Sequence, residues 1–539
     1  MSIRISLDAP PEFYTNLDII SGRVILVLNR AESIGNVIVK LEGESRTALT
    51  VPSPVDRDDY YHARPPGGAM GGDVITENHK ILYRVFQVYP DEGGSIPLQP
   101  GMHEFKFNFK FPLNNICHDE KAMSALLGLG GIGSSTGFRT MDGTKQLMLQ
   151  HVKSTLPPSL TGFPQEAEIR YYLKVTIQRP GFFKENWRYQ VGFKFLPIEP
   201  PRPAKTSQEA FARRPFTFRA RAPQHHRKSI FGNRSPSPNA EDPNQMPPNI
   251  EMSARLPFPS ILTCNKPLPL RIIARKLAPT TTRDQQVYVT ALEIALTGYT
   301  QVRVQNLENT EVTTFPIFSA PRLSPPIALF SSPSDPVDTE FEIPQSLWAD
   351  RRLPNTVAPS FRTCNLMRRY DIQMKITLSW GMQPPGSSIS LAPGRQPIAQ
   401  TITLPLKLSN VEVFSGIAPP PELLNSVSHG TNGNIVGGTG VAHNFGVQNP
   451  RPPQLPHRHN PPNLLPPQAA QQQGPQQQRP PHDPLYPPQL GTPANAMFDD
   501  APPSYDEAMA DQLAGPAARP AYSGVTAENA PSTMPAQKS

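Results

Sequence analysis

The chain has 539 residues and a formal net charge of +7; 68 residues are proline and 18% are charged. It is too long for one compact domain. Because proline is excluded from helix interiors and central strands, the chain is rich in turns and sheet edges, in long irregular segments, or in both.

The cysteines and the chain ends restrict the class of protein further. Cys117, Cys264 and Cys364 are odd in number and far from any CxxC spacing, which argues against a disulfide framework and fits a reducing compartment. No apolar run approaches the ~18–20 residues needed to cross a bilayer. The N-terminus is unlike a signal peptide, and neither end carries a lipidation motif. We therefore predict a soluble intracellular protein, not an integral membrane protein.

Residues 1–200 contain segments in which apolar and polar residues alternate. Such alternation is typical of half-buried antiparallel strands. Residues 23–28 and 37–42 follow it less strictly than three later segments. The faces predicted to be buried in those segments are Phe105, Phe107, Phe109 and Phe111; Ile169, Tyr171, Leu173, Val175 and Ile177; and Tyr189, Val191, Phe193 and Phe195. With Gly/Pro-rich breaks between them, these segments predict a β-sandwich.

Residues 201–250 lose this periodicity and predict a mobile linker. Eight basic residues and one acidic residue lie between Arg202 and Lys228. A basic block of this kind favours anionic lipid or acidic partners, or it is simply a solvated linker.

Three serines in the same linker resemble kinase sites of the basic and proline-directed types. They are Ser229 in "HRKSIFG", and Ser235 and Ser237 in "RSPSPN". A phosphate there would neutralise part of the basic block and could recruit a phosphoserine reader of the 14-3-3 type. The alternative is an exposed Ser/Pro-rich linker without regulation.

Strands return over residues 251–416 and predict a second sandwich. One face of its clearest strand is made of Tyr370, Ile372, Met374, Ile376, Leu378 and Trp380. Residues 417–539 are rich in Pro, Gln, Gly and Asn. Too little apolar surface remains there to offset the entropy of ordering, so we predict a long disordered tail.

A PPxY sequence lies within this tail, at Pro502, Pro503, Ser504 and Tyr505. Prolines pre-set the polyproline II conformation, and an aromatic groove of the WW type can take their rings while a second pocket takes the tyrosine. The acidic, helix-prone flank that follows supports a functional motif over a chance match. Upstream, Pro484, Leu485 and Tyr486 form a degenerate copy in which Asp483 replaces the first proline.

Catalytic and metal chemistry are not expected. Residues 128–133 fit GxGxxG and residues 133–137 fit GxSxG, but the flanking sequence lacks the strand, helix and partner residues that such sites require. His225 and His226 lie in the basic linker, and Cys117-His118 has no second ligand pair in the sequence. We therefore predict no catalytic residues, no metal site, no cofactor and no enzyme activity.

Two tandem sandwiches, a linker and a PPxY tail resemble the α-arrestins of fungi. Residues 156–189 are similar to the segment of the N-terminal arrestin domain that leads into its long Tyr-containing strand. Stretches similar to the strands of the C-terminal domain are "PLPLRIIARKL", "ALEIALTGYTQVRV", "SFRTCNLMRRYDIQMKITL" and "LPLKLSNVEVFSG". The fold class expected is thus all-β: two immunoglobulin-like, arrestin-type sandwiches at 1–200 and 251–416, the linker 201–250 and the disordered tail 417–539. The resemblance assigns no role to the insertion at 51–73 or the loop at 126–140.

The resemblance implies an adaptor. Such a protein would be cytoplasmic and would be recruited peripherally to the plasma membrane and endosomes. It would bind cytosolic regions of membrane transporters or receptors, and its PPxY motif would bring a WW-domain HECT-type ubiquitin ligase, so that the cargo is ubiquitinated and endocytosed. The alternative is an arrestin-fold signalling scaffold, for example in ambient-pH sensing, in which ubiquitination is a signal and not a disposal mark.

Two further alternatives come from other classes of protein. One is a carrier of small ligands in a sandwich cavity. The other is a nucleic-acid-binding protein, which is disfavoured because the basic linker offers only Phe211, Phe216 and Phe218 as stacking platforms.

Overall fold

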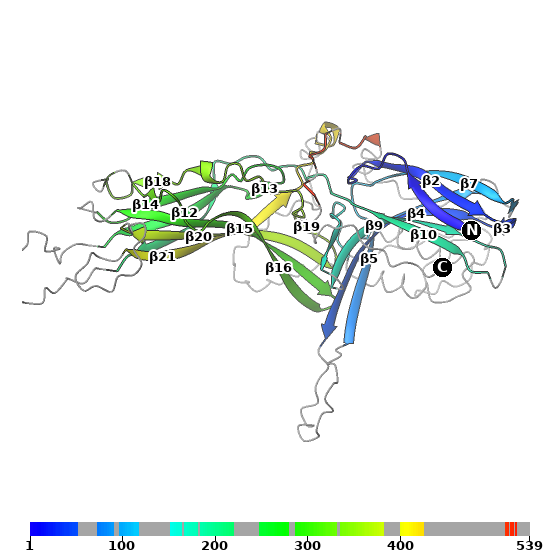
Figure 1. Ribbon diagram of the computed structural model, residues 1–539, viewed down its shortest axis with the longest axis horizontal. Coiled ribbons are helices and arrows are strands. Elements are labelled where there is room, and N and C mark those ends of the chain that lie inside the picture. The colour runs from blue at the N-terminus through cyan, green and yellow to red at the C-terminus, as the bar shows by residue number, and fades with distance from the viewer. Residues whose placement is uncertain are drawn as a thin grey trace, which may run out of the picture. The chain divides into compact units, whose positions relative to one another are not determined.

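Alternating apolar residues form strands in both halves of the described part of the chain, which confirms the all-β fold class (Figure 1). The computed structural model describes residues 1–51, 73–90, 96–117, 151–163, 166–181, 184–219, 247–279, 286–330, 332, 335–381, 399–424, 512–516, 518–521 and 523–524. All of these belong to one compact unit. No helix in the described ranges is long and apolar enough to span a bilayer.

The first sandwich is built, within the described residues, from a three-stranded sheet with the order β1-β2-β7 and a five-stranded sheet with the order β10-β9-β4-β5, in which β8 pairs with β9. A short pair, β3-β6, lies apart from both. Side chains of both sheets share one core. The strand bounds are β1 Ser2–Leu7, β2 Ile19–Leu28, β3 Glu32–Ile34, β4 Val37–Val51, β5 Asp73–Tyr89, β6 Ile96–Leu98, β7 Gly101–Lys110, β8 Leu160–Phe163, β9 Ala167–Ile177 and β10 Trp187–Phe193.

The predicted buried faces lie in this core, with one exception. The five residues of the β9 face are each no more than 1% exposed, and each such side chain contributes about 1.5–3 kcal/mol when it leaves water. On β7, Phe107 and Phe109 are also buried. The prediction is wrong for Tyr189, which is 37% exposed, because β10 lies at the edge of its sheet.

The second sandwich has, within the described residues, a four-stranded sheet β11-β12-β14-β18 and a seven-stranded sheet built on β13-β21-β20-β15-β16, in which β17 and β19 pair with β15 and β20. The six apolar residues predicted on one face of β20 are each no more than 1% exposed, which confirms that strand. The bounds are β11 Glu209–Thr217, β12 Asn249–Pro257, β13 Ile261–Thr263, β14 Arg271–Lys276, β15 Val287–Val304, β16 Leu307–Ala320, β17 Ile327–Ala328, β18 Glu340–Glu342, β19 Phe361–Arg362, β20 Leu366–Trp380 and β21 Gln400–Phe414.

Two predicted irregular regions contain ordered segments. The linker predicted at 201–250 contains β11, which pairs along its whole length with β12. Pro215 hides this strand in the sequence, but β11 is an edge strand, where proline is tolerated. The tail predicted from 417 begins with Ile417 and Leu423, which are buried, and part of its end also packs on the sandwiches. Both predictions were wrong for these segments.

Candidate functional site

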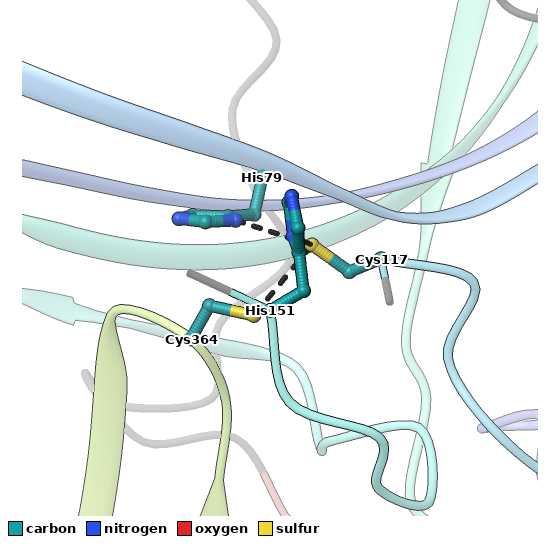
Figure 2. A group of neighbouring side chains, drawn as sticks. All are labelled: His79, Cys117, His151 and Cys364. Atoms are coloured by element: carbon teal, nitrogen blue, oxygen red, sulfur yellow. Dashed lines mark hydrogen bonds between the residues drawn. The ribbon is translucent and has the colours of Figure 1, made fainter. Parts of the chain in front are cut away.

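Four side chains that carry sulfur or imidazole nitrogen lie together where the two sandwiches meet (Figure 2). His79 is on β5, Cys117 follows β7, His151 precedes β8, and Cys364 lies in the turn between β19 and β20. The prediction that Cys117 stands alone was wrong. Its three neighbours are distant along the chain, so no spacing in the sequence indicates the group.

The contacts within this group, called here the Cys/His cluster, are short. The Sγ atom of Cys117 lies 3.1 Å from His79 Nδ1, 3.0 Å from His151 Nδ1 and 3.6 Å from Cys364 Sγ. All four ligand-type atoms lie within 4.8 Å of one another. The cysteines are free, since a disulfide would need a sulfur–sulfur distance of about 2.05 Å.

The electrostatic environment distinguishes the two thiols. Contact with Cys117 lowers the pKa of Cys364 to about 4, against the opposing effect of burial and with the help of His79. The contact with Cys364 and burial raise the pKa of Cys117. The contact therefore favours one ionised and one neutral thiol in this pair.

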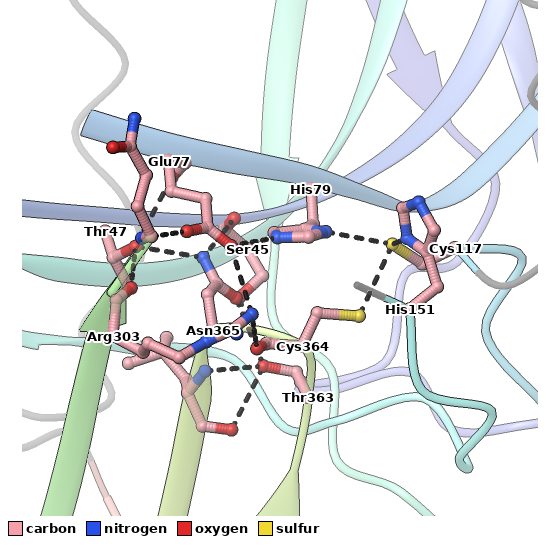
Figure 3. A network of polar contacts seen from close by, with 12 residues as sticks. Ser45, Thr47, Glu77, His79, Cys117, His151, Arg303, Thr363, Cys364 and Asn365 are labelled. Carbon is pink, nitrogen blue, oxygen red and sulfur yellow. Dashed lines mark hydrogen bonds and ion pairs between the residues drawn. The ribbon is translucent and has the colours of Figure 1, made fainter. Parts of the chain in front are cut away.

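A buried polar network extends from the Cys/His cluster along the junction (Figure 3). The Glu77 carboxylate, 2% exposed, contacts His79 Nε2 at 2.5 Å and the Arg303 guanidinium at 3.3 Å. The backbone N–H of Gln305 donates to the same carboxylate. Burial opposes ionisation of Glu77, but His79, Gln305 and Arg303 together lower its pKa. A side chain of the first sandwich is thus held by residues of the second.

Asn365, beside Cys364, ties the two sandwiches together through its amide. Its Nδ2 donates to the backbone oxygen of Ser45 at 3.0 Å and to Thr47 Oγ1 at 3.1 Å. In return, Ser45 Oγ donates to Asn365 Oδ1 at 2.6 Å. These bonds are buried and each contributes about 1 kcal/mol net, but leaving one partner unpaired would cost more. These paired bonds therefore fix which residues of the two sandwiches face each other.

A segment near the C-terminus packs against the two sandwiches. The C-terminal strap, defined by residues 512–516, 518–521 and 523–524, contacts both sandwiches. Leu513 packs against an apolar cluster that includes Phe13 and Ile417, and Arg519 Nη2 lies 2.6 Å from Asp18 Oδ1. Further contacts of the strap with the second sandwich are Asn355 Nδ2 to the Ala521 oxygen at 2.8 Å and the Ser523 N–H to Asn355 Oδ1 at 2.7 Å.

Replacing Arg519 by alanine is expected to release the C-terminal strap while the sandwiches stay folded. The substitution removes the ion pair with Asp18 and a hydrogen bond to the Phe13 oxygen. Hydrogen bonds to charged groups contribute about 1.5–3 kcal/mol, so cleavage of the strap in limited proteolysis should rise by about tenfold or more. Arg322→Ala, at an exposed arginine, is the matched control. Unchanged protection of the strap in Arg519→Ala would contradict this role.

The residues predicted to bind WW domains or to be phosphorylated lie outside the described residues. These are the motif residues Pro502, Pro503, Ser504 and Tyr505, the degenerate copy at 484–486, and Ser229, Ser235 and Ser237. The 126–140 loop and all but the ends of the 51–73 insertion also lie outside them. All of these assignments stay predictions. The chain does place Tyr505 only seven positions before Gln512, the first residue of the C-terminal strap.

Comparison with known proteins finds similarity to arrestins and to trafficking adapters. Residues 3–120 match the family described as arrestin (or S-antigen), N-terminal domain. Proteins named arrestin-related trafficking adapter 10 are also similar. That of Lachancea thermotolerans is 28% identical over 144 residues, which cover 24% of this chain and 32% of the relative. That of Candida glabrata is 32% identical over 124 residues, which cover 20% and 23%. That of Saccharomyces cerevisiae (strain S288c) is 32% identical over 127 residues, which cover 21% and 23%. The chain thus spans about a quarter to a third of the length of these relatives.

Proposed function

Because residues 3–120 match the arrestin N-terminal domain family and similar proteins are named arrestin-related trafficking adapters, we propose that the chain is an α-arrestin of the fungal type and an adaptor in membrane-protein trafficking. It binds cytosolic regions of transporters or receptors and brings to them a HECT-type ubiquitin ligase that has WW domains. The relatives named trafficking adapters support the adaptor role. An adaptor needs no catalytic residues of its own.

The PPxY motif at 502–505 is the observation that carries the ligase half of this proposal. Its prolines favour the extended conformation that WW grooves bind, so little backbone entropy is lost on binding. Tyr505 supplies an aromatic anchor, the kind of residue on which such interfaces depend most. The motif lies close in sequence to the C-terminal strap, so a ligase bound there would be tethered to the sandwiches by a short linker. Tethering of this kind raises the effective concentration to roughly millimolar.

The cargo half of the proposal rests on the family and on the two joined sandwiches. Their outer surfaces would contact the cytosolic part of the cargo, and the protein would move from the cytoplasm to the plasma membrane and endosomes. The basic block between Arg202 and Lys228 would add attraction to anionic lipid. Phosphorylation of Ser229, Ser235 or Ser237 would weaken that attraction and create sites for a phosphoserine reader.

Tyr505→Ala is expected to remove WW binding. The full-length chain should bind WW domains of HECT-type ligases with micromolar Kd, measured by calorimetry against a panel of such domains. Loss of the aromatic anchor should weaken binding by about 30-fold or more, which corresponds to about 2 kcal/mol. Tyr486→Ala, in the degenerate copy, is the matched control and should bind as the unmodified chain does. Equal binding by Tyr505→Ala, or loss only in Tyr486→Ala, would overturn the assignment of the motif.

A further inference from the structure

The Cys/His cluster has the donor set of a structural metal site. Two thiolates and two imidazoles are the ligands of many closed tetrahedral zinc sites, and the combination S₂N₂ favours Zn²⁺ over Mg²⁺ or Ca²⁺, which prefer oxygen. We propose that His79, Cys117, His151 and Cys364 bind one zinc ion that joins the two sandwiches.

The distances between the four atoms approach those of a tetrahedron around one ion. With Zn–S of about 2.3 Å and Zn–N of about 2.0–2.1 Å, the sulfur–sulfur edge is about 3.8 Å and the sulfur–nitrogen edge about 3.6 Å. The Cys117–Cys364 edge is 3.6 Å, and the edges from Cys117 to the two imidazole nitrogens are 3.1 and 3.0 Å. The remaining pairs lie within 4.8 Å. Shifts of less than about 1.5 Å therefore bring all four atoms into coordination geometry.

Neighbouring groups hold the ligands in the orientation that a metal requires. The Glu77 carboxylate contacts Nε2 of His79 and leaves Nδ1 facing the centre of the cluster. A carboxylate on the outer nitrogen of a histidine ligand is the usual second partner in zinc sites. Glu77 is itself fixed by Gln305 and Arg303.

Contacts around the cluster also bear on the orientation of Cys364 and His151. The backbone N–H of Val152 donates to Cys364 Sγ at 3.2 Å, a contact that stabilises a thiolate. His151 directs Nδ1 at Cys117, while its Nε2 is buried and has no hydrogen-bond partner among the described residues. A metal bond would fix this ring, which hydrogen bonds hold on one side only.

The position of the ligands defines what the ion does. Three ligands come from the first sandwich, and Cys364 comes from the second (Figure 2). Four protein ligands leave no open coordination position, so the site is structural and not catalytic. Because Cys364 adjoins Asn365, the ion would lock the same turn that Ser45 and Thr47 hold by hydrogen bonds. The zinc ion would thus fix how the two sandwiches are joined.

Metal content of the purified full-length protein tests this proposal. After expression with zinc present, elemental analysis should find about one zinc per chain, and replacement with cobalt should give the visible bands of a tetrahedral ion with thiolate ligands. Cys364→Ser and His151→Ala should each retain less than about a fifth of the metal. Cys264→Ser is the matched control: Cys264 is also a buried free cysteine, within the second sandwich, and this variant should keep a full complement of zinc.

Three results would overturn the proposal. The first is an unmodified chain that binds neither zinc nor cobalt. The second is a folded Cys364→Ser chain that keeps its zinc. The third is a Cys117–Cys364 disulfide in the peptide map of unreduced protein from the cytoplasm. The cobalt spectrum needs no substitution, so the proposal stays testable even where a variant fails to fold.

Discussion

Replacing Lys80 by methionine is expected to lower the free energy of unfolding by about 3–5 kcal/mol, because it leaves two buried carboxylates without the cation that they share. Lys80 Nζ contacts both Glu42 and Glu44, whose side chains are 6% and 8% exposed. Tyr172 donates to the same pair, at 2.8 Å and 2.6 Å. Arg170 Nη2 lies 2.9 Å from Glu44 and cannot neutralise both acids alone.

The matched control is Lys106→Met, on the exposed face of β7, which should change stability by no more than about 0.5 kcal/mol. Chemical denaturation of both variants near neutral pH measures the difference. Adding Glu42→Gln to Lys80→Met should recover part of the loss, since it removes the excess buried charge. Equal stability of the Lys80 and Lys106 variants would show that the buried acids do not depend on Lys80.

The same cluster of charged side chains predicts that the protein loses stability in acid. Burial would raise the pKa of Glu44, but Lys80, Tyr172 and Arg170 outweigh it and lower the pKa from 4.5 to about 2. A carboxyl group whose pKa is lowered on folding stabilises the protein above its unfolded pKa. That contribution, of the order of 3 kcal/mol, is lost as the pH falls from about 4.5 toward 2. Glu44→Gln should flatten the stability profile over this window, as measured by denaturation at successive pH values.

Removing zinc is expected to lower the free energy of unfolding by an amount similar to the loss in Lys80→Met. If free zinc stands about 1,000-fold above its Kd, binding contributes about 4 kcal/mol to folding, and a chelator should remove it. Melting curves recorded with and without chelator measure this loss. The shift should persist in Cys264→Ser and vanish in Cys364→Ser. A chelator effect of equal size in both variants would place the responsible metal elsewhere, and no effect in the unmodified chain would contradict the site.

The strands could be predicted from the sequence because their signal is local. Alternation over a few residues determines which side of β9 or β20 is buried, and the structure confirms both faces. The prediction failed where residues distant in the sequence determine whether a side chain is buried or a strand forms. Tyr189 lies on an edge strand, and β11 depends on pairing with β12 although it contains Pro215. The local pattern shows neither fact.

The Cys/His cluster could not be predicted because its two cysteines lie even further apart in the sequence than the paired strands β11 and β12 do. Cys117 and Cys364 are separated by 247 positions, and their contact exists only because the two sandwiches meet at the turn that precedes β20. The C-terminal strap was missed because its composition resembles that of the tail around it. In contrast, the PPxY motif is recognisable without any structure, since an extended peptide carries its own recognition chemistry.

The adaptor account depends most on whether the motif directs ubiquitin to membrane proteins. The decisive measurement is quantitative ubiquitin-site proteomics on membranes from cells that express the unmodified chain, Tyr505→Ala or Tyr486→Ala as the only copy. We expect a defined set of transporters or receptors to lose ubiquitin in Tyr505→Ala alone and to accumulate at the cell surface. Loss of ubiquitin without accumulation would favour the signalling scaffold. Identical membrane ubiquitination in all three strains would contradict the adaptor function.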